Sequence, residues 1–239
     1  MTNKEPNDLK ILAIIPARKG SKRIIGKNLI KFIDKPLISH TIEAAIKTKF
    51  NMDVMVFSDS EKINELANNY GQLTPLKRPK DLSGDQVSSA SVVNYILEEF
   101  KIRNVHYDIV VLLQPTSPLR RASDIDNALN ILISQQAKSV ISAFQAPYAP
   151  ESLFQMDDYF VLQKTNTVLK EVRSQDLPRY YKMNGAIYAC WVSSFNLNST
   201  FYPDPCKIYL MPYERSIDID TMSDLELATF FHEKSSSHG

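Results

Sequence analysis

Short apolar runs alternate with stretches of helical periodicity along the first part of the chain, up to residue 144. Apolar runs of this kind are typical of strands that are buried on both faces of a sheet. Strands are therefore predicted at 11–15, 53–57, 73–76, 108–113 and 139–144. Apolar residues spaced three and four apart predict helices between these strands. The helices are expected to begin at Pro36, Ser60, Ser88 and Ser123.

This alternation stops at Ala146. Residues 147–182 are polar, contain several prolines and are rich in Tyr, Gln and Asp, so we expect hairpins or an arm outside the main sheet. After this stretch, the pattern predicts strands at 186–191 and 207–211 and an extended segment at 216–220.

Two of the predicted helices begin with a capping-box pattern, in which a Ser is followed three residues later by an acid. Ser123 pairs with Asp126 in this pattern, and Ser223 pairs with Glu226. Repeated strand, loop and helix predict an α/β fold with a mostly parallel, twisted sheet and helices on both faces. We expect residues 1–239 to form a single domain into which the arm is inserted.

Composition narrows the classes of function. A net charge of +1 over 239 residues provides no global field that would attract nucleic acid or a membrane, so a polyanion site must be local. Two cysteines do not make a disulfide framework in a chain of this length. The first nine residues are polar, and no apolar run approaches the length of a membrane span. We therefore expect a cytoplasmic protein without nucleic-acid or membrane partners.

A local polyanion site is predicted directly after the first strand. Residues 16–28, PARKGSKRIIGKN, contain five cations and no acid. A bound polyanion would relieve their repulsion, and a basic, glycine-containing loop after a buried strand is the layout that wraps nucleotide phosphates. Arg18 can bind phosphate oxygens bidentately, and Lys27 can meet charge that develops on a leaving group. Ser21 and Asn28 can add neutral hydrogen bonds. The alternative is a solvated basic surface loop.

The segment SIDID, residues 216–220, predicts a metal site. In an extended segment Asp218 and Asp220 share one face, while Ile217 and Ile219 point into the core. Two neighbouring carboxylates can hold Mg²⁺, with Mn²⁺ as an alternative ion. Without a cation their repulsion would destabilise the segment. The alternative is an edge strand with a solvated acidic face.

Three further stretches contain candidate binding residues. Gln114 follows a buried strand within QPTSPLR and can hydrogen-bond to a base or a sugar, although the motif could equally be a rigid turn. Arg78 and Ser89 are hydrogen-bonding candidates within RPKDLSGDQVSS. In RSQDLPRYYKMNGAIY, the residues that could bind a polyhydroxylated acid are Arg173, Gln175, Tyr180 and Asn184.

Glycine is scarce, with six residues in the chain, so the remaining glycines are expected where only glycine fits. Four of them fall in the candidate stretches: Gly20, Gly26, Gly84 and Gly185. His40 lies on the first predicted helix, and we expect it to be structural.

Together these motifs resemble the acylneuraminate cytidylyltransferases, also called CMP-sialic acid synthetases. The matching stretches occur in family order along most of the chain: IIPARKGSKRIIGKN, FSDS, RPKDLSGDQVSS, LLQPTSPLR, NGAIY and SIDIDT. The related CMP-Kdo synthetases share the IPAR opening and resemble this chain less in the loop that follows and in the last two stretches.

The resemblance implies a Rossmann-like nucleotidyltransferase fold and a homodimer, whose arm at 147–182 reaches over the neighbour's active site; dimers could pair further into tetramers. It also implies transfer of CMP from CTP to a nine-carbon 2-keto-3-deoxy sugar acid, with Mg²⁺ as cofactor and pyrophosphate as product. The acid could be N-acetylneuraminic, legionaminic or pseudaminic acid.

The resemblance further implies roles for individual residues. Lys27 would stabilise the triphosphate in the transition state, Asp218 and Asp220 would hold the metal, and Gln114 would contact the sugar. Asp220, or a water on the metal, is a hypothesis for the general base. The residues implied to hold the nucleotide are Arg18, Ser21, Lys27, Asn28, Arg78 and Ser89.

Three other functions compete with this interpretation. A sugar-1-phosphate nucleotidyltransferase would use the same fold with another substrate. A glycosyltransferase would need a metal on a central D-x-D, for which Asp124 and Asp126 are the candidates. Because this pair lies at a predicted helix start, where acids favour the helix dipole, we interpret it as capping. A nucleotide-binding regulator without activity would need a broken catalytic set, whereas Lys27 and both SIDID acids are present.

Overall fold

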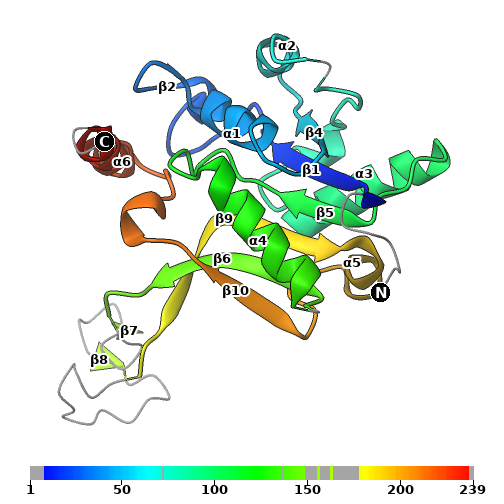
Figure 1. Ribbon diagram of the computed structural model, residues 1–239. Coiled ribbons are helices and arrows are strands. Elements are labelled where there is room, and N and C mark those ends of the chain that lie inside the picture. Colours follow the sequence, from blue (N-terminus) through cyan, green and yellow to red (C-terminus); the bar gives the residue numbers. More distant parts are fainter. Residues whose placement is uncertain are drawn as a thin grey trace.

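A computed structural model of the chain describes residues 8–71, 73–135, 137–148, 155–156, 162–163 and 178–236. Its centre is a six-stranded sheet with the order β10-β6-β9-β5-β1-β4 (Figure 1). The strands of this sheet are β1 (Ile11–Pro16), β4 (Met52–Phe57), β5 (Ile109–Leu112), β6 (Ser139–Gln145), β9 (Tyr181–Trp191) and β10 (Cys206–Leu210).

The sheet is mostly parallel, as predicted. β1 pairs in parallel with β4 and β5, and β10 pairs in parallel with β6. β9 is antiparallel to both of its neighbours, β5 and β6. The carboxyl ends of β1 and β5 therefore lie side by side, which is where parallel sheets of this kind hold their ligands.

Helices cover both faces of the sheet, also as predicted. α1 (Leu37–Ile46) and α4 (Ala122–Ser134) pack on one face, and α4 crosses the front of the sheet in Figure 1. α3 (Ser89–Ile102) and α5 (Val192–Asn198) pack on the other face. Alternate residues of β1 enter the two cores, so Ile11 and Ala13 face α1 and α4, whereas Leu12 and Ile14 face α3.

Two further helices and several short elements complete the described chain. α2 (Glu61–Asn68) follows β4, and α6 (Met222–Ser236) is the last element. The short strands are β2 (Lys31–Phe32), β3 (Lys35–Pro36), β7 (Gln155–Met156) and β8 (Leu162–Gln163). The single-turn 3₁₀ helices are η2 (Lys27–Leu29), η3 (Lys80–Leu82) and η6 (Tyr213–Arg215). Among the described residues, no helix has the length and apolarity needed to cross a membrane.

Both predicted capping boxes are placed two residues too late. The backbone nitrogen of Arg121 donates to Asp124 at 2.8 Å, so α4 is capped by this pair and not by Ser123 and Asp126. Thr221 and Asp224 cap α6 in the same way, with a 2.7 Å bond from the Thr221 nitrogen.

Three other expectations are also wrong or lie outside the described residues. Residues 73–76 are not a strand, so this prediction is wrong. The helical spacing of Ile38, Ile42, Ala45 and Ile46 predicts that all four lie on one apolar face, but Ile46 is 46% exposed. Most of the predicted arm lies outside the described residues, and its last residues, Tyr181 and Lys182, belong to β9.

Candidate active site

One cavity of about 370 Å³ lies at the carboxyl ends of β1 and β5. It brings together the residues predicted to hold a nucleotide: Arg18, Ser21, Lys27, Asn28, Arg78 and Ser89. It also contains Gln114 and the carboxylates of Asp218 and Asp220. Stretches that are far apart in the sequence therefore form one site, as the motif analysis predicted.

The basic loop that forms one wall is shaped by its own backbone contacts. Pro16 is the last residue of β1, and the Ala17 nitrogen continues the pairing by donating to the Phe57 carbonyl at 3.0 Å. Gly26 has a φ of 65°, which lets the chain turn into η2. The Asn28 side-chain amide donates to the Arg18 carbonyl at 3.0 Å. These contacts fix the backbone, and of the five cations Arg18 and Lys27 line the cavity.

Lys27 is the most deeply placed cation of this loop, with 13% of its side chain exposed. Its Nζ lies 2.9 Å from Asp220 Oδ1 and also donates to the Ile219 carbonyl at 2.9 Å. Arg23 donates to the other carboxylate oxygen of Asp220 at 2.7 Å. Asp220 thus neutralises two cations of the basic loop.

Asp218 faces the same cavity on the wall next to Thr116. Its pKa is raised, chiefly because the cavity wall removes part of its hydration and also because Asp220 is negative, whereas the Thr116 hydroxyl opposes the rise. Ile217 and Ile219 are buried between these acids, as the alternation predicted. Two carboxylates that repel each other in this way are suited to share a cation.

The donor set fits Mg²⁺ better than a closed metal site. The described part of the chain has no cluster of three or more His, Cys, Asp or Glu side chains able to hold a metal. Mg²⁺ is commonly bound by one or two carboxylates, with water and substrate phosphates completing its shell. Asp218 and Asp220 supply that minimum on the wall facing the basic loop.

Asp85 is a site residue that the motif analysis missed. Arg18 Nη1 donates a hydrogen bond to Asp85 Oδ1, and Lys22 Nζ lies 2.7 Å from Oδ2. Hydrogen bonds from Lys22 and Arg18 lower the pKa of Asp85. In the sequence, the position of Asp85 beside Gly84 was the only indication that it belongs to the site. The cations that bind Asp85 come from a loop more than sixty residues away.

Arg78 and Ser89 border the opposite wall. Arg78 is buried, and its Nε and Nη2 both donate to the Leu82 carbonyl, at 3.1 and 2.6 Å. Its guanidinium lies 5.6 Å from the ring centre of Phe57, and burial lowers its pKa. Ser89 is the first residue of α3, which Ser88 caps by accepting from the Ser91 nitrogen at 3.0 Å. The first turn of α3 therefore borders the cavity through Ser89 and Val92.

Gln114 is held in position from beneath by Arg120, a second residue that the motif analysis did not single out. The Arg120 side chain is buried and donates to the carbonyls of Gln114 and Ala186, at 3.2 and 2.7 Å, and to the Thr41 hydroxyl at 2.6 Å. Burial lowers the pKa of Arg120 to about 9. This side chain joins the end of β5 to β9 and α1.

Gly185 passes directly beside Gln114. Its φ is +73°, and a Cβ at this position would lie 2.4 Å from Gln114 Oε1. The positive φ favours glycine here, and an added Cβ would displace the Gln114 side chain. By contrast, a Cβ on Gly20 would meet nothing within 4 Å, so scarcity alone did not identify which glycines are essential.

Asn184 does not lie on the cavity, contrary to its predicted contact with substrate. It is buried, and its Oδ1 accepts from Ser142 Oγ at 2.6 Å. Its Nδ2 donates to Ser216 Oγ at 2.9 Å. Asn184 therefore ties β6 and β9 to the residue that begins SIDID, and its amide is committed to the protein interior.

Of the other predicted substrate residues only Tyr180 belongs to the described part of the chain, and it does not line the cavity. The carbonyl of Tyr180 accepts from the Ala146 nitrogen at 2.9 Å, just before β9 begins. Arg173 and Gln175 lie outside the described residues. His40 is structural as predicted, with Nε2 3.0 Å from the Phe32 carbonyl and burial lowering its pKa.

The D-x-D pair of a glycosyltransferase is not available for metal. Asp124 is buried, and one oxygen accepts from Arg215 and from the Tyr209 hydroxyl, each at 2.8 Å. Asp126 is also buried and accepts from the Lys49 nitrogen at 2.9 Å. Both acids therefore make structural hydrogen bonds between α4 and other parts of the chain.

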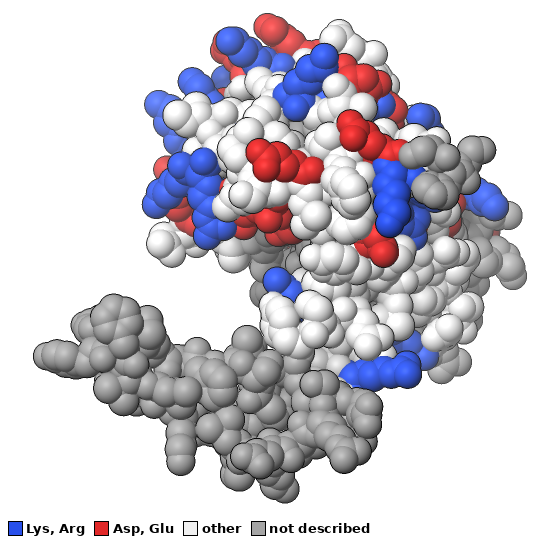
Figure 2. Space-filling model, turned by 90° about the vertical axis from the view of Figure 1, so that its left-hand side faces the viewer, with Lys and Arg blue, Asp and Glu red and all other residues white. Residues whose placement is uncertain are grey.

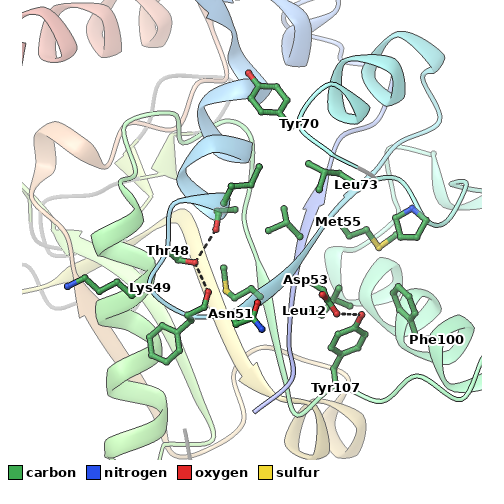
Figure 3. Close-up of a pocket in the computed structure, with 16 residues that line it drawn as sticks. Leu12, Thr48, Lys49, Asn51, Asp53, Met55, Tyr70, Leu73, Phe100 and Tyr107 are labelled. Atoms are coloured by element: carbon green, nitrogen blue, oxygen red, sulfur yellow. Dashed lines mark hydrogen bonds between the residues drawn. The ribbon is translucent and has the colours of Figure 1, made fainter. Parts of the chain in front are cut away.

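A larger cavity of about 690 Å³ opens beside the edge strand β4 (Figure 3). Its only formally charged lining residues are Lys49 and Asp53, and Asp53 accepts a 2.9 Å hydrogen bond from Tyr107. Its wall is mostly apolar, with Leu12, Met55 and Phe100 among its residues. This cavity is larger than the one at the carboxyl ends of β1 and β5, but Lys49 is the single cation among its described lining residues, whereas the smaller cavity contains Arg18, Lys27 and Arg78.

The fold and the charged cavity define an enzyme of the nucleotidyltransferase class. Residues 12–229 match the family model described as cytidylyltransferase. The chain belongs to this family, which confirms the family predicted from its motifs.

Several relatives align along nearly the whole chain. A CMP-N,N'-diacetyllegionaminic acid synthase from Legionella pneumophila is 37% identical over 92% of this chain and 94% of that protein. A pseudaminic acid cytidylyltransferase from Campylobacter jejuni is 34% identical over 94% and 97%. An N-acylneuraminate cytidylyltransferase from Escherichia coli is 33% identical over 94% of this chain and 52% of that protein.

A solved structure of CMP:2-keto-3-deoxy-manno-octonic acid synthetase complexed with CTP has the same fold, with a TM-score of 0.67. It is 19% identical and covers 95% of this chain and 99% of that chain. At this level of identity the likeness shows the fold alone, which confirms the predicted nucleotidyltransferase architecture.

Proposed function

We propose that this protein transfers CMP from CTP to the anomeric hydroxyl of a nine-carbon 2-keto-3-deoxy sugar acid and releases pyrophosphate. The observation that carries the proposal is one cavity in which Lys27 and Arg18 face Asp218 and Asp220. Its setting is a chain of the cytidylyltransferase family. The relatives named for pseudaminic, legionaminic and neuraminic acids support this class of acceptor over the eight-carbon acid Kdo.

In the proposed reaction, the anomeric oxygen forms a bond to the α-phosphorus while the bond from that phosphorus to pyrophosphate breaks. Lys27 stabilises the negative charge that develops on the transferring and leaving groups. Arg18 holds phosphate oxygens bidentately. Ser21, Asn28, Arg78 and Ser89 complete the nucleotide site by hydrogen bonding.

Asp218 and Asp220 would hold Mg²⁺, or Mn²⁺, and the ion would offset repulsion between the triphosphate and the carboxylate of the sugar acid. Asp220 must release Lys27 or Arg23 for this, since both of its oxygens are engaged by cations. The proton of the attacking hydroxyl passes to Asp220 or to a water held at this carboxylate pair.

Gln114 is proposed to bind the sugar, because it lies in the cavity next to the carboxylates and is fixed by Arg120 and Gly185. Arg173, Gln175 and Tyr180 are proposed to reach the sugar from the arm of a second subunit. Asn184 supports the site from the interior and does not bind the sugar directly.

An apolar face supports the proposed homodimer. Met183, Ala143 and Leu210 are neighbours across β9, β6 and β10. Met183 is 49% exposed, Leu210 53% and Ile208 44%. Figure 2 shows charged side chains gathered over the upper part of the face it presents, and few on the described residues below them. An exposed apolar row of this kind is typical of a surface covered by a partner.

The reaction is tested by pyrophosphate release from CTP with N-acetylneuraminic, legionaminic, pseudaminic and Kdo acids. We expect turnover of one nine-carbon acid, loss of turnover on chelation of divalent ions and recovery with Mg²⁺ or Mn²⁺. Activity with a sugar 1-phosphate alone would replace the proposal with the sugar-phosphate alternative. A folded protein that binds CTP without turning over any acid would favour a regulator.

The dimer is tested separately by light scattering after gel filtration. Leu210→Glu is expected to give monomers, because it places a charge in the apolar row. Leu197→Glu is the control, since Leu197 is 86% exposed on α5 and outside that row. A wild-type monomer at micromolar concentration would contradict the proposed arm exchange and any tetramer built from dimers.

A further inference from the structure

Asp85 lies on the loop between η3 and α3 and lines the same cavity as the basic loop. Its carboxylate is shared between Arg18 and Lys22, so it bridges the two loops across the cavity. Asp220 is placed similarly, between Lys27 and Arg23. Each of these carboxylates engages one cation that the proposed function assigns to phosphate, Arg18 or Lys27, and one neighbouring cation of the basic loop.

The two acids differ in what else they can do. Asp220 is close enough to Asp218 for their charges to interact, and together they form the proposed metal pair. Asp85 is not part of that pair, and both of its oxygens are engaged by the basic loop alone. Its contact with Arg18 involves the guanidinium needed for phosphate, so a polyphosphate can engage Arg18 fully only after Asp85 has moved away.

The contact is suited to being exchanged for a ligand. The exposed fractions of the Arg18, Lys22 and Asp85 side chains are 33%, 79% and 37%. Ion pairs with this much access to water are weak, so a triphosphate with several charged oxygens can replace one carboxylate. A carboxylate left beside the phosphates would repel them, which is the kind of unfavourable element that sets specificity.

We propose that Asp85 is a specificity-determining residue that competes with the β- and γ-phosphates of CTP for Arg18 and Lys22 and returns to them as pyrophosphate leaves. This inference rests on the proposed function. It assigns Asp85 an effect on polyphosphates only. A single phosphate held at Lys27 leaves Arg18 and Lys22 bound to Asp85, so CMP binding is not penalised.

The test compares Asp85→Asn with Asp81→Asn, measured by calorimetric titration of CTP, pyrophosphate and CMP without sugar acid. Asp81 is an exposed acid of the adjacent helix η3, and no ion pair involves it in the described chain, so the control matches the charge change. Asp85→Asn is expected to tighten binding of CTP and pyrophosphate by about 3- to 10-fold. CMP binding should change by less than about 2-fold, and Asp81→Asn should leave all three ligands near wild type.

Turnover gives a second readout. Because pyrophosphate would be retained, Asp85→Asn should lower the KM for CTP and strengthen product inhibition by pyrophosphate by about the same factor as the binding change. Asp85→Glu keeps the charge and should restore values close to wild type.

The outcomes separate this inference from the proposed function. A wild-type protein that does not bind CTP would overturn the proposed function. Wild-type binding of CTP with unchanged or weaker binding in Asp85→Asn would overturn the role of Asp85 alone. If Asp85→Asn tightened CMP binding as much as CTP binding, or if Asp81→Asn tightened CTP binding equally, the effect would come from the change in net charge alone. Either result would overturn the role of Asp85. Unfolding of Asp85→Asn, followed by circular dichroism, would make Asp85 a structural residue and also overturn the inference.

Discussion

Lys27 and Asp220 are joined by a 2.9 Å ion pair, although they are 193 residues apart in the chain. The lysine proposed to meet the reacting phosphate is therefore positioned by one of the carboxylates proposed to hold the metal. Asp220 also binds Arg23, so the acidic segment and the basic loop neutralise each other in the cavity. This pairing lets the protein concentrate cations for a polyphosphate without leaving them unbalanced in its absence.

Replacing Lys27 with Ala is expected to reduce the kcat for pyrophosphate release by about 100-fold or more, because a charge that stabilises the transition state is lost. The matched control is Lys31→Ala, since Lys31 is an exposed cation shortly after the same loop. Steady-state rates at saturating CTP and sugar acid measure the effect. A kcat within about threefold of wild type would show that Lys27 does not stabilise the transition state.

Asp218→Asn is expected to abolish activity and stabilise the metal-free protein. The native environment raises the pKa of Asp218, so the ionised carboxylate costs stability at pH values above its native pKa. That cost disappears as pH falls through the native pKa and the group is protonated. The unfolding temperature of the variant should therefore exceed wild type most at pH 7, and the difference should shrink toward pH 4.

Calorimetric unfolding at several pH values, with divalent ions removed, measures this difference. Thr221→Val serves as a comparison, since it removes a cap hydroxyl near the same segment and should lower stability at every pH. An Asp218→Asn protein that is less stable than wild type at pH 7 would show that Asp218 makes favourable native contacts that outweigh its repulsion.

Gly185→Ala is expected to destabilise the protein by about 1–2 kcal/mol, because alanine is strained at a φ of +73°. The added Cβ would also displace Gln114, from which it would be 2.4 Å, and so should raise the KM for the sugar acid more than that for CTP. Gly84→Ala is the control for stability, since its nearest neighbour would be a flexible Val87 methyl at 3.8 Å. If Gly185→Ala and wild type had equal KM values for the sugar acid, Gln114 would not be a sugar-binding residue.

Local sequence patterns predicted the parts of the fold that depend on local physics. The apolar runs at 11–15 and 108–113 became β1 and β5, because continuous apolar residues can be satisfied only when both faces are covered. Alternation at 216–220 placed Asp218 and Asp220 on the cavity and buried Ile217 and Ile219. The family motifs then indicated which residues, distant in the sequence, meet at one end of the sheet.

Features that depend on tertiary contacts were missed. β9 runs antiparallel between β5 and β6, and its direction is set by where the chain returns from the arm region, which no local pattern records. Asn184 has the same side chain whether it faces a ligand or a buried Ser142, so its burial could not be inferred. Asp85 and Arg120 acquire their roles from partners far away in sequence.

Both helix caps were misplaced for a related reason. Thr221 with Asp224 and Ser223 with Glu226 satisfy overlapping patterns, and the sequence does not say which residue leaves the extended conformation last. The bond from the Ile219 nitrogen to the Thr116 carbonyl, at 2.8 Å, holds the extended segment against the loop after β5. The helix therefore begins as soon as this contact ends.

Arg120→Met tests how far the buried scaffold controls the site. The substitution keeps much of the side-chain volume but leaves the Ala186 carbonyl and the Thr41 hydroxyl without their donor, so we expect a loss of about 3 kcal/mol of stability. For a chain of this size that corresponds to a drop of roughly 6–12 °C in Tm.

Arg120→Lys should recover only part of this loss of stability, since one ammonium cannot reproduce the planar fork that spans β5, β9 and α1. Arg121→Met is the control, because Arg121 is exposed and caps α4 through its backbone, and it should change stability by less than about 0.5 kcal/mol. If Arg120→Met unfolded at the wild-type temperature, the buried guanidinium would not be what holds Gln114 in position, and the geometry of the sugar site would have to come from Gly185 and the backbone alone.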